Sequence, residues 1–130
     1  MTYFPQPNPA NRPRRVRVPG AVVVAVRSEG SQPVRALLHV LSATGGLLVL
    51  SKALEQGDVV EVAFRTNHGI VRGMAELLSA RCELKSGCLQ PFRFVTLDDE
   101  DHTRLRMTLE SLLDQILIGS TRAPTSHWIS

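Results

Sequence analysis

The chain of 130 residues is poor in aromatic side chains, which make up 5% of it, and it has two cysteines. So few aromatics count against a protein that binds single-stranded nucleic acid by base stacking. No apolar run approaches the ~20 residues of a membrane span, and the N-terminus lacks the pattern of a secretion signal. We therefore predict a cytoplasmic protein in which Cys82 and Cys88 are free thiols, although the hairpin turn expected between them makes a cross-strand disulfide geometrically conceivable.

The sequence also lacks a recognisable catalytic or metal-binding pattern. The nucleophile motif GxSxG, the phosphate-binding P-loop and the zinc-binding motif HExxH do not occur in it. The four histidines do not cluster at ligand spacing; they are His39, His68, His102 and His127. The acidic run from Asp98 to Asp101 is better explained as the start of a helix, where unpaired N–H groups stabilise carboxylates. We expect no enzyme, no metal and no cofactor.

Positive charge is modest overall, with a formal net charge of +3, but it is concentrated near the N-terminus. Four arginines fall within residues 12–17, a segment called here the arginine arm: Arg12, Arg14, Arg15 and Arg17. A guanidinium pairs bidentately with phosphate oxygens or with guanine O6 and N7, and it stacks on purine faces. The arm therefore suggests a phosphate-bearing partner. A solvated charged surface is the plainer alternative.

Two apolar runs meet at residues 42–46, Ser-Ala-Thr-Gly-Gly, called here the Gly-Gly joint. Paired glycines between strand-like segments indicate a sharp bend with positive φ or a close approach to the backbone. Gly45 and Gly46 would let a ligand approach, and Ser42 and Thr44 could donate hydroxyl hydrogen bonds to it. We interpret the joint as one wall of a pocket that the arm closes.

Six short strands are expected, over residues 21–26, 34–41, 47–50, 59–65, 70–78 and 88–97. In the fourth, Val60, Val62 and Phe64 alternate with polar residues, the period of a strand with one face in water. Pro91 predicts that the sixth strand lies at an edge or starts irregularly. After it, leucines from Leu105 recur at helical spacing, and Gly119 is expected to close that helix.

The predicted fold is mainly β: a six-stranded antiparallel β-barrel with one C-terminal amphipathic α-helix, because closure removes exposed strand edges. Residues 1–13, rich in proline and asparagine, are expected to be disordered or only loosely docked. Residues 14–117 would form the barrel domain with its helix. Residues 118–130 would form a tail, in which Trp128 stays unassigned.

The order of these parts resembles the PilZ domain family over residues 12 to 117. The resemblance implies a bacterial receptor for the second messenger cyclic di-GMP, with ligand motifs RxxxR in the arm and (D/N)xSxxG after the second strand. Here Gly46 aligns with the final glycine, which puts Leu41 at the Asp/Asn position and Ala43 at the serine position. Arg12 and Arg15 are three residues apart, and Arg15 and Arg17 two.

Three functions follow from this pattern. The first is a stand-alone, non-enzymatic signalling adaptor that binds cyclic di-GMP through the arginine arm and the Gly-Gly joint and acts on a downstream protein. The second is a degenerate PilZ-type module that works by protein contact without the nucleotide, as Leu41 and Ala43 favour. The third, a barrel that binds nucleic acid, fits the arm but not the scarcity of aromatics.

Overall fold

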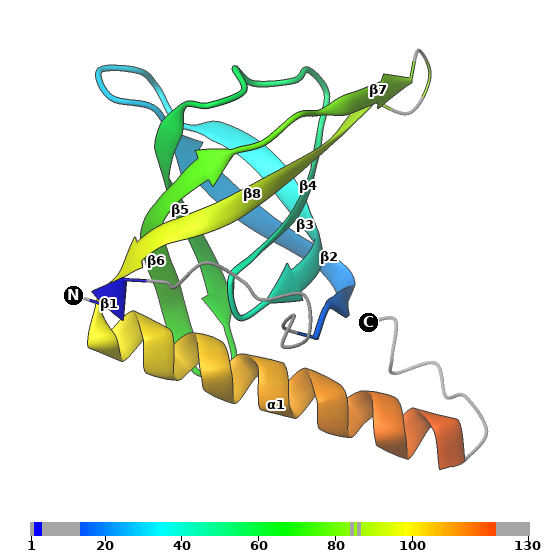
Figure 1. Ribbon diagram of the computed structural model, residues 1–130. Coiled ribbons are helices and arrows are strands. Elements are labelled where there is room, and N and C mark those ends of the chain that lie inside the picture. Colours follow the sequence, from blue (N-terminus) through cyan, green and yellow to red (C-terminus); the bar gives the residue numbers. More distant parts are fainter. Residues whose placement is uncertain (1, 4–13, 84, 86, 122–130) are drawn as a thin grey trace.

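The computed structural model describes residues 2–3, 14–83, 85 and 87–121, and is drawn in Figure 1. Arg12 and Trp128 lie outside the described residues. The strands are β1 (Thr2–Tyr3), β2 (Val16–Arg27), β3 (Val34–Ser42), β4 (Gly45–Leu50), β5 (Val59–Thr66), β6 (Gly69–Leu77), β7 (Arg81–Glu83) and β8 (Gly87–Leu97). One helix follows them, α1 (Asp99–Thr121).

Six strands close into a barrel. They are hydrogen-bonded in the order β8-β4-β3-β2-β5-β6, every pair is antiparallel, and β6 pairs with β8 to complete the ring. β1 and β7 add short pairings to β8 outside this ring. Figure 1 shows α1 lying across one end of the barrel. The predicted mainly β fold, a six-stranded antiparallel barrel with a C-terminal helix, is confirmed.

The core fills the barrel with side chains from alternate strand positions. In β5, Val60, Val62 and Phe64 are buried, as the period-two pattern predicts. In β8, Phe92 and Phe94 pack edge to face, with ring centroids 5.3 Å apart and planes at 83°. The helix contributes Leu105, which is 1% exposed, so α1 closes the barrel with its apolar face.

The first strand starts earlier than predicted, at Val16 instead of Ala21. Val16 is 2% exposed and lies opposite Leu41 of β3, so its burial holds the segment in the sheet. The pairing shifts register between Arg17 and Val22, and Gly20 within this interval has a φ of 77°. A bulge that needs glycine therefore interrupts β2 without ending it.

Two further boundaries differ from the sequence prediction. Pro91 lies inside β8, opposite Leu47 of β4, and not at an edge. Proline is tolerated there because β6 ends at Leu77, opposite Phe92, so Pro91 falls just beyond that ladder. The helix continues through Thr121 and does not end at residue 119. In the part of the chain described here, no helix is long and apolar enough to cross a membrane.

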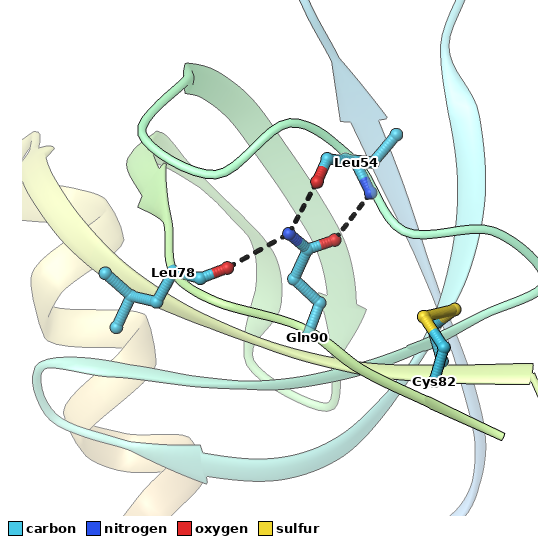
Figure 2. Close-up of a disulfide and its surroundings, with 5 residues drawn as sticks. Leu54, Leu78, Cys82 and Gln90 are labelled. Atoms are coloured by element: carbon cyan, nitrogen blue, oxygen red, sulfur yellow. Dashed lines mark hydrogen bonds between the residues drawn. A yellow bond between two sulfur atoms is a disulfide. The ribbon is translucent and has the colours of Figure 1, made fainter.

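The prediction of free thiols is wrong. Cys82 of β7 and Cys88 of β8 form a disulfide, drawn in Figure 2. The two cysteines are directly opposite each other in the β7–β8 hairpin, with Cα atoms 4.0 Å apart. The prediction rested on the reducing character of the expected compartment, whereas the pairing follows from the register of the hairpin, which brings the two sulfurs together.

Candidate functional site

The Gly-Gly joint contains the two-residue connection between β3 and β4, Ala43 and Thr44. The last residue of β3, Ser42, pairs with the first of β4, Gly45. The Ser42 hydroxyl oxygen accepts a hydrogen bond from the Thr44 N–H at 3.3 Å and donates to the Gly45 carbonyl at 3.3 Å. The Thr44 carbonyl accepts from the Phe94 N–H at 2.8 Å. The joint is therefore held by its own hydrogen bonds and by β8.

Both glycines of the joint are required by close packing and not by an unusual backbone. A Cβ added at Gly45 would lie 2.1 Å from the Phe92 carbonyl oxygen. One added at Gly46 would lie 2.5 Å from the Val40 carbonyl oxygen and 2.9 Å from the Phe92 ring. Positive φ is found at other glycines: Gly20, Gly30, Gly57, Gly69 and Gly87. Of the two sequence interpretations, close approach applies here, and the approaching groups belong to β8 and β3.

The side chain at the Asp/Asn position of the family motif belongs to the core. Leu41 is 1% exposed and packs with the other buried apolar residues of the barrel. Its neighbour Ser42 is 7% exposed, and its hydroxyl oxygen lies 3.4 Å from that of Thr44. The joint therefore contains hydroxyl and backbone groups but no carboxylate or amide side chain. Ser42 and Gly45 are buried, whereas Ala43, Thr44 and Gly46 are partly exposed.

The pairing of β2 with β3 brings the arginine arm beside the joint. Val16 is opposite Leu41, and Arg17 is opposite Val40. Because Val16 points into the core, Arg17 lies on the outer face of the barrel, where its side chain is exposed. Arg14 and Arg15 are exposed as well and immediately precede this strand. Three of the four predicted arginines thus reach the surface next to the joint.

A polar row that the sequence reasoning missed runs across the same surface. Ser42 is opposite Gly45, Gly45 is opposite Arg93 of β8, and Arg93 is opposite Glu76 of β6. We call these four residues the outer row. Directly opposed residues of antiparallel strands share a face of the sheet. This face is the outer one, because the neighbours Phe92 and Phe94 of Arg93 are buried.

Arg93 and Glu76 form an ion pair within the outer row. The Nη2 atom of Arg93 lies 2.5 Å from Oε1 of Glu76, and the two side chains are 39% and 31% exposed. Period-two alternation with Phe92 and Phe94 could have indicated that Arg93 faces outward. That Glu76, 17 residues earlier in the chain, stands beside it follows only from the β6–β8 register.

A hollow of about 610 Å³ lies elsewhere, at the far end of β4. Its lining includes Val49 and Leu50 together with both cysteines and Lys85. None of the predicted site residues lines it. Within the described residues, no group of three or more histidine, cysteine or carboxylate side chains could hold a metal ion.

The model of the PilZ domain family matches residues 11–113 of this sequence. The chain belongs to the PilZ domain family. This PilZ domain has no significant sequence match among curated proteins.

Solved structures support the fold. The PilZ chain is similar to YcgR from Escherichia coli in complex with c-di-GMP, with 18% identity and a TM-score of 0.74 over 87% of this chain and 50% of that one. It is similar to the PilZ domain of YcgR from Escherichia coli with c-di-GMP, with 19% identity and a TM-score of 0.68. The match covers 86% of this chain and 98% of that one. It is also similar to the Bacillus subtilis inhibitor of motility MotI/DgrA, with 16% identity and a TM-score of 0.65. The match covers 86% of this chain and 57% of that one. The chain thus spans about half the length of the YcgR chain in the first structure and nearly all of the PilZ-domain chain in the second.

Proposed function

We propose that this PilZ domain binds cyclic di-GMP on the outer face of the barrel, between the arginine arm and the Gly-Gly joint. The proposed contacts are Arg12, Arg14, Arg15, Arg17, Ser42, Thr44, Gly45 and Gly46. The observation that carries the proposal is the β2–β3 register, in which Arg17 is opposite Val40 and Val16 opposite Leu41. In this register the backbone of the arm runs beside the strand that leads into the joint.

The chemistry of the arm suits the ligand. Cyclic di-GMP carries two phosphates and two guanines, and a guanidinium binds both kinds of group bidentately. Exposed Arg14, Arg15 and Arg17 provide several such donors within four residues. Similarity to two structures that contain c-di-GMP supports the same ligand class here.

As a signalling adaptor without catalytic activity, the domain would respond to the nucleotide through the arm. A ligand bridging the arm and the joint favours one arrangement of the arm against the barrel. The surface near β2 that a downstream protein meets would then differ between the free and bound forms. The partner in this proposal is therefore a protein that contacts the arm or its neighbouring strands.

Calorimetric titration with cyclic di-GMP at moderate salt tests the proposal. The wild-type protein should bind saturably, and an Arg14→Ala, Arg15→Ala double variant should bind at least about 100-fold more weakly, because each charge-assisted hydrogen bond contributes roughly 1.5–3 kcal/mol. Arg27→Ala with Arg35→Ala is the matched control. It removes the same charge from exposed positions at the opposite end of β2 and β3, and should leave the affinity unchanged.

The alternative is a degenerate PilZ module that works by protein contact without a nucleotide. The burial of Leu41 at the position of the family's ligand-binding carboxylate or amide favours it. A titration of the wild-type protein without saturation up to high micromolar cyclic di-GMP would reject the receptor and favour this module.

A further inference from the structure

Guanine presents two donors, N1–H and the N2 amino group, on its Watson–Crick edge, and a protein that reads this edge needs an acceptor for them. A carboxylate suits both donors at once because it has two acceptor oxygens. The Gly-Gly joint cannot provide one, since its side chains are those of serine, alanine, threonine and glycine, and Leu41 is buried. A carboxylate for this edge must therefore come from another element.

Glu76 is the carboxylate that the sheet brings to the joint. It stands in the outer row, separated from Gly45 only by Arg93 of β8. Because neighbouring strands are about 4.8 Å apart, the backbone of Glu76 is roughly 10 Å from that of Gly45. A ligand with two bases and two phosphates that contacts the joint can extend across this distance.

The position of Glu76 is well defined. Its neighbours in β6, Ala75 and Leu77, are both buried, so the strand is anchored on each side and the carboxylate points outward. Arg93 holds the carboxylate through the 2.5 Å ion pair. A carboxylate offers about four acceptor positions and a guanidinium five donors, so a single bond between them leaves capacity on both for a ligand.

We infer that Glu76 is the residue that makes this site specific for guanine. The inference rests on the proposed binding of cyclic di-GMP. Glu76 accepts hydrogen bonds from N1–H and the N2 amino group of one base, and Arg93 acts as a positioning residue that directs the carboxylate. Adenine has an acceptor at N1 and no N2 amino group, so the carboxylate disfavours cyclic di-AMP.

The sign of the electrostatic effect makes the test informative. Glu76 is an acidic residue next to a site for a ligand with two negative phosphates. Removing it without any specific contact would strengthen binding, because a like charge disappears. The change in charge therefore cannot explain a loss of affinity on removal.

The experiment compares calorimetric titrations of wild type, Glu76→Ala and Arg93→Ala with cyclic di-GMP and cyclic di-AMP. Glu76→Ala should weaken cyclic di-GMP binding by about 10- to 100-fold and leave cyclic di-AMP unchanged or slightly stronger, so that the preference for guanine is lost. Arg93→Ala should weaken both nucleotides, because it also removes a positive charge, but cyclic di-GMP more.

Glu100→Ala is the matched control. It removes a carboxylate of the same kind from an ion pair with Arg104 on α1, outside the outer row, and should change neither affinity. Thermal unfolding checks that each variant is folded. If Glu76→Ala keeps the wild-type affinity and preference, the role of Glu76 is overturned while the receptor proposal stands. If the wild-type protein binds neither nucleotide, both are overturned.

Discussion

Replacing Gln90 by leucine tests how two connections of the barrel are held to β8. Gln90 has no exposed surface, and its amide makes three hydrogen bonds, shown in Figure 2. Its Oε1 accepts from the Leu54 N–H at 2.8 Å. Its Nε2 donates to the carbonyls of Leu54 at 2.9 Å and Leu78 at 3.0 Å. The side chain thus joins the β4–β5 connection and the residue that follows β6.

The expected loss is large for a domain of this size. Each hydrogen bond contributes about 1 kcal/mol net, so the three together contribute about 3 kcal/mol to the free energy of unfolding. Leucine would bury more apolar surface, but it would leave the backbone groups of Leu54 and Leu78 without this partner. Since domains are stable by about 5–15 kcal/mol, we expect the melting temperature of Gln90→Leu to fall by about 10 °C.

Urea unfolding followed by circular dichroism measures the loss in the free energy of unfolding, and thermal unfolding measures the fall in melting temperature. Gln56→Leu is the control, because the same chemical change is made in an exposed turn, and it should alter stability by less than about 0.5 kcal/mol. If Gln90→Leu unfolds at the same urea concentration as Gln56→Leu, the three hydrogen bonds do not stabilise the fold and the reasoning is refuted.

Two more predictions concern the fold. Gly46→Ala should lower the free energy of unfolding by about 1–3 kcal/mol, because the new methyl group would meet the Val40 carbonyl and the Phe92 ring; an unchanged urea midpoint would contradict this packing. Cys82→Ser with Cys88→Ser should lower stability by about 2 kcal/mol, the chain-entropy value for so short a loop. A thiol assay of the unreduced, unfolded wild-type protein should find no reactive thiol, and finding two would rule out the disulfide.

Much of the fold could be predicted from the sequence because strand periodicity is local. Val60, Val62 and Phe64 alternate with polar neighbours, and each is buried as that pattern requires. Asp99, Glu100 and Asp101 lie in the first turn of α1, where the helix dipole favours them. Closure into a barrel followed from the need to pair strand edges. The strand periodicity and the acidic start of the helix depend on near neighbours in the chain, and near neighbours are visible in a sequence.

The site was only partly predictable. The sequence pointed to the arginines and to the joint, since unusual composition marks both. Their proximity depends on Val16 pairing with Leu41 across a bulged strand, which no local pattern specifies. The spacing of the glycines suggested close approach, but that Phe92 is the approaching residue is a matter of packing between strands.

By itself, the sequence determined the fold class, the helix and the family, because hydrophobic period and motif order are properties of the linear chain. Only the tertiary structure decided that Cys82 meets Cys88, that Leu41 turns into the core, and that Glu76 stands beside Arg93. The physical reason is strand register: a shift of one residue between two strands would reverse the face of every side chain, and register is set by the closed sheet as a whole.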